Sequence, residues 1–281
     1  MKVSFVGIGL MNGSLSLDLQ HLYPDAVMQG ISRKEATLKR AFDLGLIHQT
    51  GDLHQLQDAD WVFVSIPVEA IAHLLPQILD AVGEKTLVID FGSTKSAICQ
   101  AVKNHPKRDQ FLAAHPIAGT EHSGPDAAVS ELYKGKTIML CETARTRDAL
   151  LDRAEKLFGQ LGMIIRRMDP VEHDKHIAYV SHLSHITSFM LGKTVLEKET
   201  DEQNIFDMAG SGFASTVRLA KSSPEMWMPI FAQNKQNVLE TLDEYIRNMN
   251  AFKEKLAADA HEELLAEMKE INKIKTILEH K

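Results

Sequence analysis

The chain has 281 residues, which is enough for two domains of ordinary size that each bury a core. Its formal net charge of -7 excludes the basic surface typical of nucleic-acid binding, so we expect no nucleic-acid partner. The two cysteines, Cys99 and Cys141, are too few for a disulfide framework, which favours a cytoplasmic location. No apolar run reaches the roughly 18 residues of a membrane helix. Because the chain opens inside a strand, we also expect no signal peptide.

The opening stretch has the pattern of a strand, a glycine-rich turn and a helix. Val3–Val6 predicts the strand, Gly7 and Gly9 follow at once, and Leu10–His21 predicts the helix. The first glycine permits a tight turn, and the second lets the backbone approach a pyrophosphate at the positive end of the helix. We therefore assign four residues to a dinucleotide site: Gly7, Gly9, Leu10 and Met11.

Strand and helix patterns alternate through the first half of the chain. Further strands are predicted at Val27–Ile31, Trp61–Ile66, Thr86–Asp90, Phe111–Ala114, Thr137–Cys141 and Gly162–Arg167. Helices are predicted at Glu35–Leu44 and Val68–Val82, and from Lys95 through Lys103. This alternation predicts an α/β fold with a Rossmann-type, doubly wound sheet.

The pattern changes at Asp169, after which almost no strand signal remains. Long helical windows follow at Val171–Lys198, Phe206–Ala220, Glu225–Ala258 and His261–His280. We therefore predict two domains, a dinucleotide-binding domain over residues 1–169 and an all-α domain over residues 170–281 that binds substrate and forms a dimer.

The end of the second strand carries no carboxylate for a ribose 2′-hydroxyl. Ser32 stands at the expected place, with Arg33 and Lys34 behind it. A hydroxyl and two cations suit a 2′-phosphate, so we predict NADP over NAD, although these cations could be solvated or Arg33 could stack on adenine. Ser65 and Pro67, at the end of the third strand, are also assigned to the cofactor site.

Two loops at the carboxyl ends of neighbouring strands carry the candidate catalytic groups. Ser93 follows the fourth strand and His115 follows the fifth, in a loop bordered by proline and glycine. In a doubly wound sheet such loops line the ligand crevice. A histidine of near-neutral pKa can accept the proton of an alcohol while hydride leaves the same carbon, and a hydroxyl can orient it.

These residues stand in sequence blocks that resemble the prephenate dehydrogenase family of tyrosine biosynthesis, which includes the arogenate dehydrogenases. The matching blocks are Gly7-Ile-Gly-Leu-Met-Asn-Gly-Ser14, Gly92-Ser-Thr-Lys95, His115-Pro-Ile-Ala-Gly-Thr-Glu-His-Ser-Gly124, Ser181-His-Leu-Ser-His185 and, more loosely, Gly212-Phe-Ala-Ser-Thr-Val-Arg-Leu-Ala220. They occur in the family's order and span most of the chain, and the block that begins at His115 is the most specific.

The resemblance implies a role for each matching residue. His115 would be the catalytic histidine bonded to the ring hydroxyl, with Ser93 as its partner, and Arg218 would bind a substrate carboxylate. The substrate pocket would be lined by Thr120, Ser181 and His185, and Trp227 would lie near its mouth, although Trp227 could instead fill the core. Family members are homodimers that join through the helical domain. His182 and His185 have a spacing that also suits a metal, but no third ligand is evident nearby, so we expect no metal.

The sequence departs from the family pattern at three places. Asn12 replaces the last glycine of the fingerprint, and Ser184 stands where proline is common. Ala214 and Ser215 replace an Arg-Asp pair, which leaves open the group that would orient Arg218.

The reaction implied by the resemblance is oxidative decarboxylation of prephenate to 4-hydroxyphenylpyruvate with NAD(P). L-Arogenate is the alternative substrate, because it differs only by an amino group far from the hydride. The predicted fold is also compatible with a 3-hydroxyacid dehydrogenase, an imine reductase or a non-enzymatic dinucleotide sensor.

Overall fold

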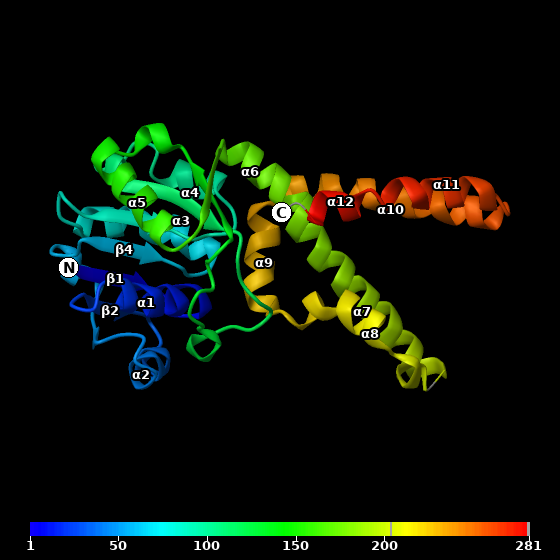
Figure 1. Cartoon of the computed structure of the whole chain (residues 1–281), viewed down its shortest axis with the longest axis horizontal. Coiled ribbons are helices and arrows are strands. Elements are labelled where there is room, and N and C mark those ends of the chain that lie inside the picture. Colours follow the sequence, from blue (N-terminus) through cyan, green and yellow to red (C-terminus); the bar gives the residue numbers. More distant parts are fainter. Residues whose placement is uncertain (203, 280–281) are drawn as a thin grey trace. The chain divides into compact units, whose positions relative to one another are not determined.

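The computed structural model describes residues 1–202 and 204–279, and its main feature is a single sheet (Figure 1). The strands run in the order β3-β2-β1-β4-β5-β6-β7-β8. Their bounds are β1 Lys2–Val6, β2 Val27–Ile31, β3 Gln49–Thr50, β4 Trp61–Val64, β5 Leu87–Asp90, β6 Phe111–Pro116, β7 Thr137–Cys141 and β8 Ile164–Met168. The predicted α/β class with a Rossmann-type sheet is therefore confirmed.

The sheet reverses its strand order at β1, which pairs in parallel with both β2 and β4. The carboxyl ends of β1 and β4 therefore flank the switch point where such sheets bind ligands. Two features were not predicted. β3 has only two exposed residues, and β7 runs antiparallel to β6, so that the segment after His115 folds back beside the strand that carries it.

Helices cover the sheet, and the strands beneath them are apolar on both faces. The helices of this part are α1 Leu10–Leu22, α2 Glu35–Asp43, α3 Val68–Ala81, α4 Ser96–Ala101 and α5 Asp148–Gln160. β4 and β5 are buried throughout, as expected for central parallel strands. In one core layer the ring of Phe63 stacks on that of Phe5 and meets that of Phe91 at a tilt.

The helical region after Asp169 is more broken than predicted. The predicted helix Val171–Lys198 consists of α6 Pro170–Ile177, a π-helical turn at Ala178–His182 and α7 Leu183–Glu202. The predicted helix Phe206–Ala220 is wrong as a continuous element, because only α8 Ser211–Thr216 is α-helical and short 3-10 turns flank it. Glycines at 210 and 212 disfavour a longer helix. α9 Pro224–Gln233 follows.

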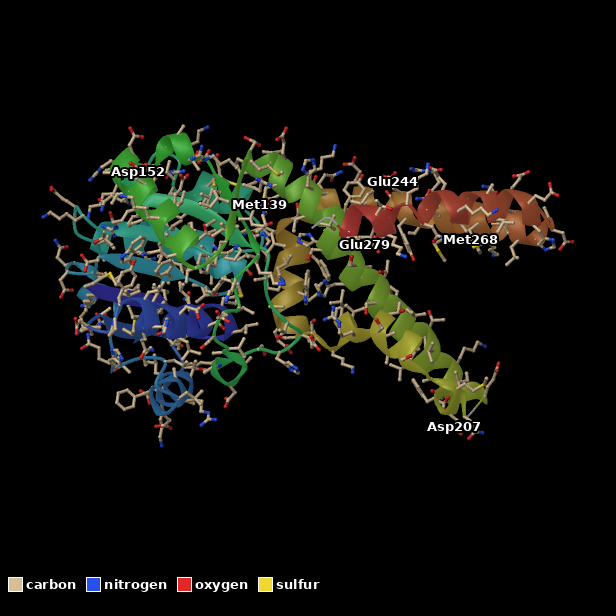
Figure 2. All side chains as sticks on the ribbon, viewed as in Figure 1. Met139, Asp152, Asp207, Glu244, Met268 and Glu279 are labelled. Atoms are coloured by element: carbon tan, nitrogen blue, oxygen red, sulfur yellow. The ribbon has the colours of Figure 1, made fainter. Side chains whose placement is uncertain are left out.

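The chain divides into two compact units, Met1–Lys235 and Gln236–Lys281. The first contains the sheet and the helices up to α9. The second is helical, with most of α10 Lys235–Ala257, α11 His261–Ile271 and α12 Ile274–Glu279, and Lys255 pairs with Glu267 at 2.6 Å. Several apolar side chains of this second unit are exposed, including Met268 (Figure 2). Among the described residues, no helix is both long and apolar enough to cross a membrane.

Candidate active site

The turn after β1 has the geometry of a dinucleotide cradle. Gly7 adopts a φ of 81°, and its N–H donates to the carbonyl of Ile31 at 2.8 Å. A Cβ at this position would collide with the carbonyl oxygen of Ser65. A Cβ at Gly9, the N-cap of α1, would meet no described atom closer than 3.9 Å, so the turn leaves room where a phosphate would approach. The first N–H groups of α1, including those of Leu10 and Met11, have no partner within the helix.

Asn12 compensates for the missing third glycine. Its buried amide Nδ2 donates to the carbonyls of Gly7 at 2.6 Å and Phe63 at 3.2 Å, and so connects the turn to β4. The close packing that a third glycine normally allows is provided one residue later. At Gly13 a Cβ would lie 2.8 Å from the Cβ of Ala128.

The end of β2 presents the predicted ribose-binding residues at the surface. Ser32 accepts a hydrogen bond from the N–H of Lys34 at 3.2 Å, and both Arg33 and Lys34 are exposed immediately before α2. Ser65 and Pro67 lie directly after β4, where Pro67 is the N-cap of α3. The predicted cofactor residues thus follow β1, β2 and β4, at the same edge of the sheet.

His115 lies near the end of β6 and is half-buried. Its Nδ1 is 2.9 Å from the Nε2 of His173, and the two rings meet edge to face. Burial holds the pKa of His115 well below its usual value, and the charge of Lys95 and any positive charge on His173 or His182 act in the same direction. The imidazole is therefore neutral near pH 7 and able to accept a proton.

His173 and Asp174 were not identified from the sequence. Both are buried on α6, and the Nδ1 of His173 is 2.9 Å from the Oδ1 of Asp174. The sequence does contain a start signal for α6, the N-cap residue Asp169. Its side chain accepts hydrogen bonds from the two N–H groups after Pro170. The sequence pattern gave no reason to bring that helix to His115.

A buried ion pair supports the loop that carries Ser93. Lys95 and Asp90 are both fully buried, and their side chains form an ion pair. The Nζ of Lys95 also donates a hydrogen bond to the carbonyl of Ala114 at 2.8 Å. Burial raises the pKa of Asp90, and the ammonium of Lys95 opposes that rise. The pair connects the end of β5 with the residue before His115. Ser93 lies in this loop, but the hydrogen bond at the Nδ1 of His115 joins it to His173, so the role of Ser93 stays a prediction.

Arg218 has a partner that the sequence did not predict. Its Nη1 lies 3.0 Å from the Oε2 of Glu121, the residue after Thr120 in the loop that follows β6. Glu121 thus provides the carboxylate that Ala214 and Ser215 lack. Thr120 is exposed, and its hydroxyl accepts a hydrogen bond from the N–H of His122 at 3.2 Å.

The remaining predicted pocket residues meet around one aromatic side chain. The ring of His185 lies on that of Trp227, with centroids 3.6 Å apart, and the His185 Nδ1 donates to the carbonyl of Ser181 at 2.9 Å. Trp227 is buried in a small apolar cluster with Val68. His182, also buried, meets Trp227 edge to face, and burial lowers its pKa to about 4. No group of three or more His, Cys, Asp or Glu side chains suited to a metal occurs in residues 1–202 and 204–279.

A doubly wound sheet, a glycine turn at its switch point and a neutral imidazole at the same edge define a nucleotide-dependent dehydrogenase. Residues 15–166 match the family description "Prephenate dehydrogenase, nucleotide-binding domain", and residues 169–270 match "Prephenate dehydrogenase, dimerization domain". The chain belongs to the prephenate dehydrogenase family.

Individual relatives agree with this assignment. The chain is 26% identical to the cyclohexadienyl dehydrogenase of Zymomonas mobilis over 98% of its own length and 95% of that protein. It is 28% identical to the prephenate dehydrogenase of Bacillus subtilis, over 89% and 69%. The structure of Aquifex aeolicus prephenate dehydrogenase with hydroxyphenyl propionate and NAD+ is similar at a TM-score of 0.89 and 32% identity, over 99% and 97%. Synechocystis arogenate dehydrogenase is similar at 0.78 and 27%, over 98% and 99%.

Proposed function

We propose that this chain oxidises prephenate with a nicotinamide dinucleotide and releases carbon dioxide, which gives 4-hydroxyphenylpyruvate for tyrosine biosynthesis. The observation that carries the proposal is the neutral imidazole of His115 at the ligand-binding edge of a sheet with this family's fold. When bound, the nicotinamide accepts a hydride from the carbon that bears the ring hydroxyl. Loss of carbon dioxide then makes the ring aromatic, so the step is effectively irreversible.

His115 is the proposed base of this reaction. Its ring takes the proton of the ring hydroxyl while carbonyl character develops at the same carbon, and it returns the proton to that oxygen as carbon dioxide leaves and the ring becomes a phenol. The low pKa keeps the imidazole unprotonated before the reaction. Ser93, from the adjacent loop, is the proposed hydroxyl partner of His115.

Arg218 is the proposed site for a substrate carboxylate, because a guanidinium binds a carboxylate with two parallel hydrogen bonds. Its ion pair with Glu121 orients the side chain in the absence of substrate. We place Thr120, Ser181, His185 and Trp227 around the substrate side chain. The stacked His185 and Trp227 rings support that placement.

The cofactor is held at the glycine turn, and we propose that NADP is preferred over NAD. Gly7, Gly9 and the first turn of α1 would hold the pyrophosphate. The half-buried hydroxyl of Ser32 and the exposed cations of Arg33 and Lys34 support binding of a 2′-phosphate. That the similar Aquifex aeolicus structure contains NAD+ makes the comparison of the two dinucleotides informative.

We further propose two domains, residues 1–169 and 170–281, and a homodimer formed through the second. The two family descriptions meet between residues 166 and 169, which supports the boundary. The dimerization description and the exposed apolar side chains of α10 and α11 support the dimer. Light scattering coupled to size exclusion should give twice the 31.4 kDa mass of the chain.

One assay tests the function. Formation of reduced cofactor is followed by absorbance with prephenate and with L-arogenate, each with NAD+ and with NADP+. We expect turnover with prephenate that is faster with NADP+ at limiting cofactor. Faster turnover of arogenate would assign the chain to arogenate, as the similarity to Synechocystis arogenate dehydrogenase allows. No turnover with either substrate would refute the proposal.

A further inference from the structure

A continuous series of hydrogen bonds runs from a buried carboxylate to the proposed catalytic ring. The Oδ1 of Asp174 is 2.9 Å from the Nδ1 of His173, and the Nε2 of His173 is 2.9 Å from the Nδ1 of His115. Within this series of three described side chains, which we call the histidine chain, the Nε2 of His115 is the nitrogen that remains for a ligand.

The carboxylate fixes the direction of the first hydrogen bond in the histidine chain. Asp174 accepts the N–H of Lys95 at 2.7 Å on one oxygen and the N–H of Ser96 at 2.8 Å on the other. Burial alone would raise the pKa of Asp174, but the hydrogen bonds from His173, Ser96 and Lys95 outweigh it and hold the pKa below its usual value. An ionised carboxylate only accepts hydrogen bonds, so the Nδ1 of His173 must be the donor.

The tautomer of His115 follows from that donor. When the ring of His173 carries a single proton, on Nδ1, its Nε2 has a lone pair that can only accept a hydrogen bond. The Nδ1 of His115 therefore carries the proton, and its Nε2 presents the lone pair that a base requires. A second proton on His173 would reverse this direction and leave an N–H on the Nε2 of His115.

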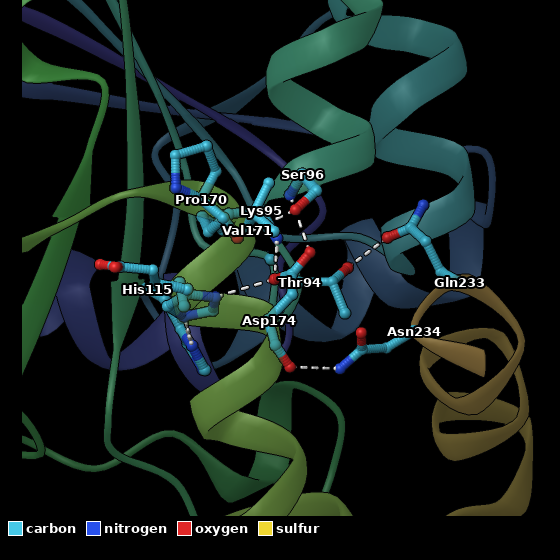
Figure 3. A network of polar contacts seen from close by, with 12 residues as sticks. Thr94, Lys95, Ser96, His115, Pro170, Val171, Asp174, Gln233 and Asn234 are labelled. Carbon is cyan, nitrogen blue, oxygen red and sulfur yellow. Dashed lines mark hydrogen bonds and ion pairs between the residues drawn. The ribbon is translucent and has the colours of Figure 1, made fainter. Parts of the chain in front are cut away.

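The fold holds the histidine chain firmly in place. Asp169 caps the first turn of α6, and the Ser96 hydroxyl donates to the carbonyl of Pro170 at 2.9 Å. The amide of Asn234 donates to the backbone carbonyl of Asp174 at 2.6 Å (Figure 3). Contacts from three separate segments thus fix the position of Asp174.

We infer that His173, oriented by Asp174, is a positioning residue that fixes the tautomer and the ring orientation of His115. The inference rests on the proposed function and extends it, because it says which residues hold the proposed base in the tautomer that can accept a proton. After His115 takes up a proton, the lone pair of His173 accepts the hydrogen bond from the resulting imidazolium, and Asp174 stabilises the pair. Among the described residues, the other charged or titratable groups that act on His115 are Lys95, with its partner Asp90, and His182.

Two substitutions at one position separate the two contacts of His173. In His173→Asn the amide takes the place of Nδ1, which keeps the contact to Asp174 but removes the acceptor for His115. In His173→Gln the amide oxygen takes the place of Nε2 and can still accept from His115. We expect kcat to fall roughly 10- to 100-fold in His173→Asn with KM within about twofold, and His173→Gln to retain most of the activity.

The pH dependence of kcat/KM tests the inference further, because a merely structural role of His173 would not shift it. Loss of a neutral acceptor disfavours the imidazolium of His115, so the acid limb of kcat/KM should move to lower pH in His173→Asn. An unmoved limb, or a limb moved to higher pH by loss of a repelling charge, would overturn the inference. Equal kcat values for the two variants, at equal melting temperatures, would do the same.

Nitrogen NMR of the imidazole rings tests the inference without turnover. In the unmodified chain at pH 7.5, the Nδ1 of His115 should be protonated and its Nε2 bare, whereas His173→Asn should show exchange between both tautomers. A proton on the Nε2 of His115 in the unmodified chain would refute the inference even if prephenate is turned over. The expected tautomer in a chain that turns over neither prephenate nor arogenate would refute only the proposed function.

Discussion

The glycine turn after β1 and the histidine chain beside β6 lie at the same edge of one sheet, but they are held in different ways. The turn is fixed by backbone geometry, by the φ of 81° at Gly7 and by the absence of a side chain there. The histidine chain is fixed by side chains from α6, where His173 lies 58 residues beyond His115. The geometry of the turn is therefore set by steric exclusion, whereas that of the histidine chain depends on the position of single protons.

The largest expected effect is on stability, from a substitution at the first glycine of the turn. Gly7→Ala introduces a Cβ against the Ser65 carbonyl at a left-handed φ, so we expect a loss of about 4 kcal/mol of unfolding free energy and no measurable nucleotide binding. Gly9→Ala is the matched control, because its Cβ has room in the protein. It should lower nucleotide affinity but leave the urea midpoint unchanged. Equal stability losses in both variants would contradict the steric explanation.

The next expected effect is on chemistry alone. His115→Asn removes the proposed base, so kcat should fall on the order of 100-fold or more. Nucleotide affinity, measured by fluorescence titration, should stay unchanged because the turn does not depend on this side chain. A kcat near that of the unmodified chain would remove His115 from the proposed role.

Loss of the proposed carboxylate site should act on substrate binding. Arg218→Ala should raise KM for prephenate on the order of 10- to 100-fold with little change in kcat, as loss of uniform binding does. Lys221→Ala, which removes an exposed cation on the same short 3-10 turn, is the control and should leave KM unchanged. If Arg218→Ala leaves KM as it was, another cation binds the carboxylate.

The helical side of the site should also lose stability in acid. The folded chain holds the pKa of His182 at about 4, below the value near 6.5 expected when unfolded, so the unfolded state binds a proton first as pH falls. This stability is complete above pH 6.5, and about 2 kcal/mol of it should be lost between pH 7 and pH 5. Urea unfolding of His182→Asn should show a shallower dependence on pH. An equal slope would contradict the assignment.

The smallest expected effect is on the choice of cofactor. Arg33→Ala should weaken NADP+ binding roughly 10-fold and leave NAD+ binding within about twofold, because only the former has a phosphate for the guanidinium. Isothermal titration with both dinucleotides measures this. Equal weakening of both would indicate that Arg33 stacks on the adenine instead.

The contrast between local geometry and contacts distant in sequence also explains which parts of the fold the sequence could predict. The turn and strands such as Val27–Ile31 and Thr137–Cys141 follow from patterns within a few residues, and their bounds were predicted as the structure has them. β3 is too short to leave a pattern, and the antiparallel direction of β7 depends on where the chain returns. These features depend on contacts distant in sequence.

The candidate site likewise contains residues that sequence motifs predict and partners that they do not. His115 and Arg218 stand in recognisable blocks, and the structure brings each to the edge or to the loops that follow it. Their hydrogen-bond partners, His173 and Glu121, were missed as partners because each comes from a segment 58 or 97 residues away. Nothing near either residue in the sequence indicates that pairing.

The π-helical turn at Ala178–His182 sets the direction in which α7 presents its side chains. A π turn contains one more residue per hydrogen-bonded ring than an α turn. The extra residue is thus taken up within the turn, and a regular α-helix with the same number of residues would rotate the side chains of α7 by about 100° relative to those of α6. His185 would then leave Trp227 while His173 kept its place. Deletion of one residue in the turn would instead join α6 and α7 into one α-helix with His185 still directed toward Trp227.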